Sequence, residues 1–283
     1  MIYHRPNGGI STYTRRLVAA LERLDHDHRY TVLHSRRGRE SVVTRFRHGV
    51  VWTPAHHRLE RIALAAELAR FRLDVLHTTD FIPPWRGARR HIASIHDLTF
   101  LHYPQFLTAE SRRYYNDQIV WAARHADHIL TISVASKQDL ISMLNVPPEK
   151  ITVQLLAAEP HFRPLPPERR DQHRVALNLP ERYVLFVGTL EPRKNIGGLI
   201  EAYRFLLDQL PDAPPVVIVG QLGWLFAETR ARIEALQLGD RVIWRDDIDN
   251  DALPALYALA DTLVLPSFYE GFGLPALEAM ACG

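Results

Sequence analysis

The feature that most constrains the fold is an alternation along the whole sequence: short apolar runs are followed by longer stretches with apolar residues at helical spacing. Short apolar runs bounded by turn residues predict buried strands, and the longer periodic stretches predict amphipathic helices. Strands that alternate with helices are typical of a parallel sheet wound in βα units. We therefore expect an α/β protein whose ligands bind at the carboxyl ends of its strands.

The expected elements form two groups, separated by a segment with five prolines at residues 158–180. In the first group we expect strands at 30–34, 74–78, 91–95, 127–133 and 150–155, and helices at 10–24, 59–71, 108–126 and 133–145. In the second group we expect strands at 183–188, 215–220, 241–244 and 258–265, and helices that begin at Asn195 and Pro275. The inward faces of two helices are predicted to hold Ile10, Tyr13, Leu17, Leu21 and Leu24, and Ile196, Leu199, Ile200, Tyr203 and Leu206.

The last predicted strand leads into a loop that contains Glu270 and the glycines Gly271 and Gly273. Pro275 suits the first turn of the following helix, and we expect Glu278 in that same turn. A helix N-terminus beside glycines binds phosphate through its backbone N–H groups. Carboxylates do not bind phosphate, so the two glutamates suit hydroxyl groups, such as those of a ribose and a sugar. The residues thus predict a sugar-nucleotide site; the alternative is a glycine-capped loop with solvated glutamates.

This stretch, E-G-F-G-L-P-A-L-E followed by A-M-A-C-G, resembles the signature of retaining glycosyltransferases of family four, which have the GT-B fold. The segments HDL, ADHILTIS and PPEKITV resemble the acceptor domain of the same family, so the resemblance covers nearly the whole chain. It implies an α/β, GT-B-like fold with two Rossmann-like parallel-sheet domains. We expect an acceptor-binding domain at 1–157, a linker at 158–180 and a nucleotide-sugar-binding domain at 181–283.

Each end of the sequence lacks an element that such a fold needs. Only a few residues precede Gly8-Gly9, where the first strand is expected, and no strand follows the helix begun at Pro275. We therefore expect a fragment truncated at both ends, with the first strand missing and the second domain incomplete.

In the second domain, Arg193 and Lys194 lie between a strand end and a helix start, where two cations suit a diphosphate. The resemblance carries this pair onto the diphosphate of the donor. It also implies that Glu270 holds the hydroxyls of the transferred sugar and that Glu278 holds the ribose. The remaining substrate-binding residues expected in this motif are Gly271, Phe272, Gly273 and Leu274.

In the first domain, His96 and Asp97 directly follow a predicted strand, at the edge where ligands bind in parallel sheets. We expect His96 to act on the reacting sugar, with Asp97 beside the substrate; a structural His–Asp pair is the alternative. Gly8 and Gly9 open the first helix, and the resemblance implies that they face the donor phosphates and the acceptor. Without the resemblance, a plain turn would be the better interpretation of these glycines.

The versions TLEPRKN and YEGFGLP look like those of mannosyltransferases that build bacterial surface polysaccharides. The resemblance therefore implies transfer of a hexose with retention of configuration, with GDP-mannose as first-choice donor. The acceptor is expected to be a saccharide or a polyprenyl-diphosphate-linked glycan. Two alternatives from other classes stay open: a non-catalytic sugar-nucleotide-binding partner, and a sugar-nucleotide epimerase with the same two-domain architecture.

The charge is divided unequally along the chain. Residues 1–150 hold 22 Lys and Arg against 14 Asp and Glu, whereas residues 151–283 hold 12 against 18. Such asymmetry indicates an anionic partner for the first half: an anionic membrane surface or a lipid diphosphate, with a solvated basic face as the alternative. Nucleic acid is disfavoured because no recognition motif accompanies the charge. The densest cluster consists of Arg36, Arg37, Arg39, Arg45 and Arg47.

Other features concern location and competing chemistry. The sequence has one cysteine, a polar start and no apolar run of ~18–20 residues, so we expect a cytoplasmic protein, with peripheral contact on the inner face of the membrane as an option. Asp-x-Asp matches occur at Asp25/Asp27, Asp247/Asp249 and Asp249/Asp251, all outside the predicted site. We therefore expect no metal and no cofactor.

Overall fold

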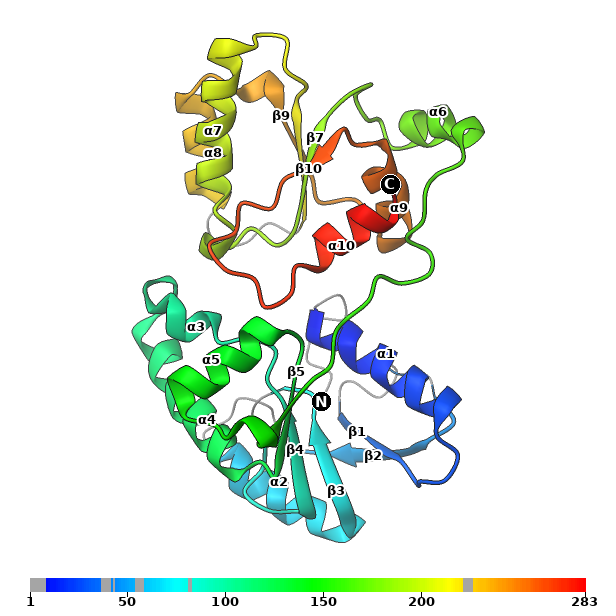
Figure 1. The fold of residues 1–283 in the computed structure, drawn as a ribbon, viewed down its shortest axis with the longest axis vertical. Helices are drawn as coiled ribbons and strands as arrows, with labels where there is room; N and C mark the ends of the chain where they lie inside the picture. The colour runs from blue at the N-terminus through cyan, green and yellow to red at the C-terminus, as the bar shows by residue number, and fades with distance from the viewer. Residues whose placement is uncertain (1–8, 37–41, 43, 54–58, 81–82, 221–225) are drawn as a thin grey trace. The chain divides into compact units, whose positions relative to one another are not determined.

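The computed structural model describes residues 9–36, 42, 44–53, 59–80, 83–220 and 226–283. The chain divides into two compact units, Met1–Leu155 and Leu156–Gly283. Figure 1 labels most of the helices and strands of the two units. Every strand pairing in the described residues is parallel, as the alternation of strands and helices predicts.

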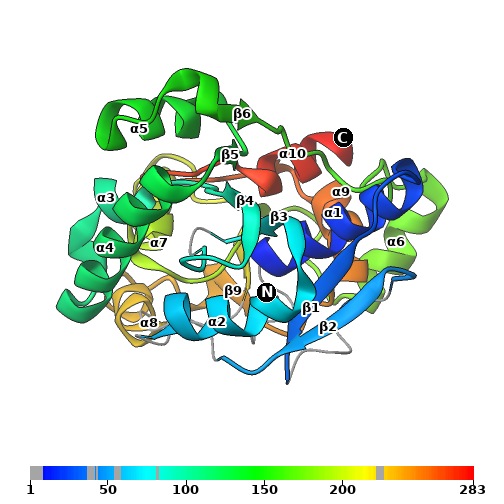
Figure 2. The same ribbon diagram turned by 90° about the horizontal axis from the view of Figure 1, so that it is seen from below.

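The first unit contains a four-stranded sheet in the order β3-β4-β5-β6 and a separate two-stranded sheet, β1-β2. Its strands are β1 (Thr31–Ser35), β2 (Arg47–Val51), β3 (Leu73–Thr78), β4 (Ala88–Ser94), β5 (His128–Thr131) and β6 (Ile151–Val153). Its α-helices are α1 (Gly9–Leu24), α2 (Glu60–Leu68), α3 (Thr99–His102), α4 (Ala109–His125) and α5 (Val134–Leu144). Figures 1 and 2 show the β1-β2 pair beside β3, on the opposite side of the unit from α5.

The second unit contains one four-stranded sheet in the order β10-β7-β8-β9. Its strands are β7 (Val184–Val187), β8 (Val216–Val219), β9 (Val242–Arg245) and β10 (Thr262–Leu263). Its α-helices are α6 (Pro167–Ala176), α7 (Ile196–Gln209), α8 (Phe226–Ala235), α9 (Leu253–Leu259) and α10 (Leu274–Ala281). All four residues of β8 are buried, as expected for a central parallel strand covered on both faces.

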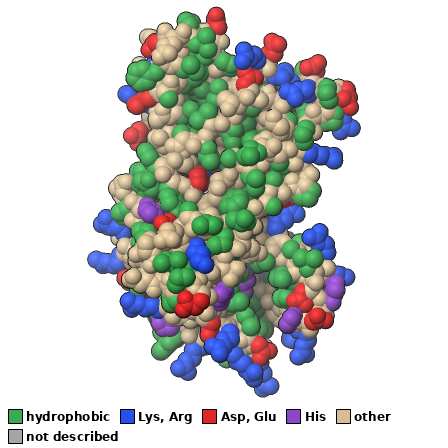
Figure 3. All heavy atoms as spheres, in the orientation of Figure 1, with side chains coloured by type: hydrophobic (Ala, Val, Ile, Leu, Met, Phe, Trp, Pro, Cys, Tyr) green, Lys and Arg blue, Asp and Glu red, His purple; other side chains and the backbone are tan. Residues whose placement is uncertain are grey.

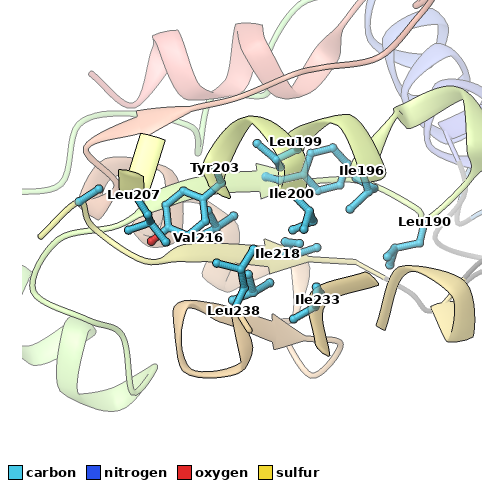
Figure 4. Close-up of a cluster of buried hydrophobic side chains, with 13 residues drawn as sticks. Leu190, Ile196, Leu199, Ile200, Tyr203, Leu207, Val216, Ile218, Ile233 and Leu238 are labelled. Atoms are coloured by element: carbon cyan, nitrogen blue, oxygen red, sulfur yellow. The ribbon is translucent and has the colours of Figure 1, made fainter. Parts of the chain in front are cut away.

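The core on one face of this sheet is built largely by α7, β7 and β8 (Figure 4). Asn195 caps α7 as predicted: its side chain accepts a hydrogen bond of 3.3 Å from the backbone N–H of Gly198. The prediction for Leu206 was wrong, because this side chain is 40% exposed and Leu207 lies in the core instead. The core positions of α7 are Ile196, Leu199, Ile200, Tyr203 and Leu207.

The expected linker, residues 158–180, contains α6, and its Phe162 and Leu179 lie in the core of the second unit. Two further expectations about the fold differ from the structure. The segment 258–265 is not a continuous strand, since α9 extends to Leu259 and β10 covers Thr262–Leu263. In α1, Ile10 and Leu24 are 37% and 72% exposed, and the buried residues are the polar Ser11 and Thr14.

Two glycines follow β7 and β8 at the carboxyl edge of the sheet, and their backbones approach closely. Gly188 donates its N–H to the carbonyl of Val219 at 2.9 Å, and both Gly188 and Gly220 have positive φ, +156° and +153°. A Cβ on Gly220 would overlap the carbonyl oxygen of Gly188. Glycine is therefore required at position 220 by backbone contact, not by a nearby side chain.

We expect Gly220→Ala to lower the free energy of unfolding by about 2 kcal/mol or more, because the methyl group collides with backbone that has little room to move. Urea unfolding monitored by circular dichroism measures this difference. Gly197→Ala in α7 is the matched control: a Cβ there meets nothing within 4 Å, so stability should stay equal or rise by up to about 1 kcal/mol. Equal stability of the two variants would contradict the assignment.

Candidate active site

The candidate site of the second unit is centred on the carboxylate of Glu270, which lies in the loop after β10. Its Oε1 accepts hydrogen bonds from Lys194 Nζ at 2.5 Å and from Ser267 Oγ at 2.6 Å. Its Oε2 lies 3.3 Å from Arg193 Nη1. Arg193 also contacts Glu191, with Nε 3.0 Å from Oε2. Two cations and two carboxylates therefore form one network that joins the loops after β7 and β10.

The network is shielded from water, and this determines its electrostatics. The side chain of Lys194 is 8% exposed and that of Glu270 is 19% exposed. Burial alone would raise the pKa of Glu270, but hydrogen bonds from Lys194 and Ser267 and the charges of Lys194 and Arg193 together lower its pKa below the ordinary value. Glu270 is thus a carboxylate at neutral pH.

Backbone contacts fix the loop that carries Glu270. The N–H of Phe268 donates to the carbonyl of Arg193 at 2.9 Å, and Asn195 Nδ2 donates to the carbonyl of Pro266 at 3.2 Å. Because β10 pairs with β7 in the sheet, the loops after these two strands begin side by side. One asparagine therefore caps α7 and also ties down the loop that holds the carboxylate.

The helix α10 begins beside this loop. Gly273 is its N-cap with φ +90°, a left-handed conformation that favours glycine, and Pro275 lies in the first turn as predicted. Gly271 is buried, and Phe272 and Leu274 are half-buried. The amides at the start of the helix carry the partial positive charge that attracts anions.

Glu278 lies in the second turn of α10, not in the first as expected, because the helix begins at Leu274. The hydroxyl of Tyr257 donates to its Oε2 at 2.8 Å. Burial and, to a lesser degree, the charge of Glu159 raise the pKa of Glu278, against the hydrogen bond from Tyr257. The pKa of Glu270 is therefore lowered, whereas the pKa of Glu278 is raised.

In the first unit, His96 and Asp97 follow β4 at the carboxyl edge of its sheet. His96 Nε2 lies 3.1 Å from the carbonyl oxygen of Thr79, and the ring of Tyr13 packs edge-on against the imidazole at 4.8 Å between centroids. Asp97 accepts a hydrogen bond of 2.9 Å from the backbone N–H of Thr99. The two side chains have separate partners in these contacts, which do not pair them with each other.

The other predicted residues of the first unit lie at its start. Gly9 is the first residue of α1 and is exposed, whereas Gly8 lies outside the described residues. Arg37 and Arg39 of the basic cluster also lie outside them.

The sequence analysis missed Ser267, Tyr13, Thr14 and Thr79. A local signal for Ser267 exists, because a serine three residues before a carboxylate is within reach of it in a tight loop. No comparable signal exists for the other three residues, whose contacts join α1 to strand ends that lie far away in the sequence.

No group of three or more His, Cys, Asp or Glu side chains in the described part of the chain is arranged to hold a metal ion. Among the same residues, no helix has the length and apolar character needed to cross a membrane.

Comparison with known sequences gives matches over both units. Residues 7–154 match the family model described as Glycosyltransferase Family 4, and residues 168–283 match the model described as Glycosyl transferases group 1. O-antigen chain mannosyltransferase B of Escherichia coli is 33% identical over 216 residues, which are 74% of this chain and 55% of that protein. Serotype-specific mannosyltransferase WbdA of Escherichia coli is 31% identical over 206 residues, 71% of this chain and 25% of that protein. The chain thus spans about half the length of the first relative and a quarter of the second.

Comparison with solved structures concerns the fold. WaaG, a glycosyltransferase involved in lipopolysaccharide biosynthesis, superposes with a TM-score of 0.76 at 18% identity, over 100% of this chain and 78% of that one. Anabaena Alr3699/HepE, solved in complex with UDP and glucose, gives a TM-score of 0.75 at 18% identity, over 100% and 77% of the two chains. These likenesses confirm the predicted fold class, an α/β protein of the GT-B type.

We expect Lys194→Met to lower the free energy of unfolding at pH 7 by about 2–4 kcal/mol, because it leaves the half-buried carboxylate of Glu270 without its nearest cation. The lowered pKa of Glu270 gives stability that is present above the pKa of an unfolded glutamate, ~4.3, and that is lost as the pH falls through the folded pKa. The difference between wild type and variant should therefore shrink towards pH 4, as measured by urea unfolding at both pH values.

Arg230→Met is the matched control for this prediction. Arg230 pairs with Glu234 on α8, and both side chains are 66% exposed, so its loss should cost no more than about 1 kcal/mol. A pH-independent cost for Lys194→Met would show that the lysine acts by packing alone.

Proposed function

The chain belongs to glycosyltransferase family 4, and from this membership we propose that it transfers a hexose from a nucleotide-diphosphate sugar with retention of configuration and without a metal ion. The proposed acceptor is a saccharide or a polyprenyl-diphosphate-linked glycan in surface polysaccharide synthesis. The observation that carries the proposal is the half-buried Glu270 carboxylate held by Lys194, Arg193 and Ser267 beside the start of α10. In this arrangement Arg193 and Lys194 are cations that suit a diphosphate, and Glu270 is an ionised acceptor that suits hydroxyls. All three lie in the adjacent loops after β7 and β10.

The two cations, Arg193 and Lys194, would stabilise the leaving group. Negative charge develops on the diphosphate as the glycosidic bond breaks, and Arg193, Lys194 and the amides at the start of α10 would stabilise it. A diphosphate bound to Lys194 and Arg193 would replace Glu270 as their counter-ion. Ser267 would then remain as a donor to Glu270, whose other oxygen is available for sugar hydroxyls.

The rest of the motif would hold the nucleotide. Glu278 would accept a hydrogen bond from a hydroxyl of the ribose. The hydrogen bond from Tyr257 would keep the Glu278 carboxylate in place. The backbone of Gly271, Phe272, Gly273 and Leu274 would border the phosphates. We assign no dedicated general base: an oxygen of the leaving phosphate would take the proton of the acceptor.

Residues of the first unit complete the proposal. His96 would contact the transferred sugar, and Gly8 and Gly9 would lie at the phosphates and the acceptor, with Asp97 near the substrate through the turn it caps. The half-buried position of His96 at the carboxyl end of β4 supports this role, because ligands of parallel sheets bind at that edge.

The donor proposal, GDP-mannose, has two supports. The motif versions in this chain resemble those of mannosyltransferases, and both Escherichia coli relatives carry that activity in their names. HepE was solved with UDP and glucose, so the uridine nucleotide is the first competitor to test.

An anionic membrane is the proposed peripheral partner. Arg36 lies over the indole ring of Trp52 at 4.6 Å, and Trp52 is 63% exposed. An exposed tryptophan beside an arginine suits the interface between lipid headgroups and water. Figure 3 shows Lys and Arg side chains along the outline of the first unit, in keeping with its positive charge balance.

The test of the transferase proposal measures release of nucleoside diphosphate from GDP-mannose and from UDP-glucose, with and without a mannosylated acceptor. We expect release that depends on the acceptor. Glu270→Gln should lower kcat by about 100-fold, because the amide keeps the shape but loses the charge that meets the oxocarbenium-like sugar. Binding of GDP, measured by calorimetry, should change by less than about ten-fold.

Glu234→Gln on the exposed face of α8 is the control and should leave turnover unchanged. An epimerase or a non-catalytic binding partner would show no release of nucleoside diphosphate that depends on the acceptor. Unchanged turnover of Glu270→Gln would refute the role given to this carboxylate.

We expect Arg36→Glu to weaken binding to phosphatidylglycerol vesicles by about five-fold or more, since each basic residue near an anionic surface contributes about 1 kcal/mol. Binding, measured by vesicle sedimentation, should also weaken as salt rises, because surface charges are screened over ~8 Å at physiological ionic strength. Arg230→Glu in the second unit makes the same change of charge and should have little effect. Equal binding of wild type to phosphatidylcholine vesicles would reject the anionic-membrane proposal.

A further inference from the structure

A cluster of polar and aromatic side chains joins α1 to the carboxyl ends of β3 and β4. Tyr13 and Thr14 come from α1, Thr79 follows β3, Ser94 ends β4, and His96 follows it. Apart from Tyr13 and His96, these side chains are 7% exposed or less. Buried polar groups are costly unless they are hydrogen-bonded, so their bonding pattern is strongly constrained.

The contact of His96 with Thr79 defines the tautomer of the imidazole. The carbonyl oxygen of Thr79 is only an acceptor, so the Nε2 atom at 3.1 Å must carry the proton. In the neutral ring, Nδ1 is then an acceptor. No group in the described part of the chain has a hydrogen bond with Nδ1.

Thr14 holds the residue that sets this tautomer. Its hydroxyl shares a hydrogen bond of 2.9 Å with the hydroxyl of Thr79 and donates to the carbonyl of Ile10 at 2.8 Å. The side chain of Thr79 is therefore hydrogen-bonded to α1, while its backbone carbonyl accepts the hydrogen bond from His96 Nε2. A shift of α1 would move the carbonyl and the imidazole together.

Tyr13 also packs against the imidazole of His96. Its ring meets His96 edge-on, with an interplanar angle of 80°. Its hydroxyl lies 3.2 Å from Ser94 Oγ and donates to Gln154 Oε1 at 3.2 Å, and Ser94 Oγ is 2.8 Å from His77 Nε2. Burial raises the pKa of Tyr13, so the hydroxyl keeps its proton at neutral pH and can donate a hydrogen bond to Gln154.

We propose that Tyr13 and Thr14 are positioning residues that hold His96 in the Nε2–H tautomer, with Nδ1 as the atom that accepts a hydrogen bond from a substrate hydroxyl. The inference rests on the proposed function insofar as His96 contacts the substrate. It goes beyond that function by naming the reacting atom of His96 and the two side chains of α1 that define it.

A purely structural role for the cluster makes a different prediction. If Tyr13 and Thr14 only fastened α1 to the sheet, their loss would lower stability and leave the tautomer and the kinetic constants of the folded protein unchanged. The tautomer itself is therefore the decisive readout.

The experiment records long-range ¹H–¹⁵N correlation spectra of protein with ¹⁵N-labelled histidine, with the His96 signals assigned from His96→Asn. Wild type should show the Nε2–H pattern. Thr14→Val, which keeps the shape and removes the hydroxyl, should give a mixture of tautomers. Its kcat with GDP-mannose should fall about 10-fold while the KM for the donor changes less than about two-fold, as for a misplaced reacting group.

Three further variants complete the test. Thr14→Ser keeps the hydroxyl and should restore both tautomer and kcat; Tyr13→Phe, which keeps the ring, should lower kcat less than Thr14→Val does. Thr12→Val is the matched control on α1, because the Thr12 hydroxyl contacts Arg15 of the same helix. A thermal melt verifies that each variant is folded. If Thr14→Val does not fold, the tautomer of wild type and the spectra and kcat of Thr14→Ser and Tyr13→Phe still test the inference.

An Nδ1–H pattern in wild type would overturn the inference, as would unchanged tautomer and kcat in folded Thr14→Val. If wild type transfers no sugar from any donor, the proposed function fails, whereas the spectra still test how α1 positions His96. The two failures are thus distinguishable.

Discussion

The ion pair between Lys194 and Glu270 is the contact on which the candidate site of the second unit depends. A lysine that is only 8% exposed needs a counter-ion, because a buried charge without a partner costs several kcal/mol. Glu270 provides the charge, and its own burial is offset by Lys194, Arg193 and Ser267. The loop after β10 therefore has one favourable position, with its carboxylate against the turn that follows β7.

This pair exists because β10 is the neighbour of β7 in a parallel sheet. Carboxyl ends of adjacent parallel strands meet at one edge, so residues 76 positions apart lie within hydrogen-bond distance. The close approach of Gly188 and Gly220 at the same edge follows from the pairing of β7 with β8. The sheet order thus brings the backbone, the cations and the carboxylate to one place.

The first unit uses a different chemistry at the equivalent edge of its sheet. Hydroxyl groups join α1 to the ends of β3 and β4. Burial lowers the pKa of His77, which contacts Ser94, to about 4 and keeps that ring uncharged at neutral pH. Directional hydrogen bonds of this kind fix orientation, whereas the charges of the second unit suit an anionic ligand. The two edges are therefore organised for different tasks within the proposed transfer reaction.

Features that depend on local chemistry could be predicted from the residues alone. The alternation of strands and helices gave the α/β class, Ser133 and Asn195 cap the helices that follow them, and Pro275 lies in the first turn of α10. The same local reasoning misjudged which leucine of α7 faces the core, because Leu206 and Leu207 both fit helical spacing and only the packed sheet distinguishes them. Nor did the proline-rich composition of residues 158–180 indicate that Phe162 and Leu179 would lie in the core of the second unit.

Which side chains meet depends on how the elements pack, and the residue pattern does not show this. The pairing of Glu270 with Lys194, the role of Ser267 beside them and the contact of Tyr13 and Thr14 with the residues around His96 all depend on strand order and on where α1 lies. Periodicity specifies which face of an element is buried but not which element covers it. Local patterns could therefore propose Glu270, Lys194 and His96 as site residues, whereas Ser267, Tyr13 and Thr14, which contact them or their neighbours, needed the packed structure.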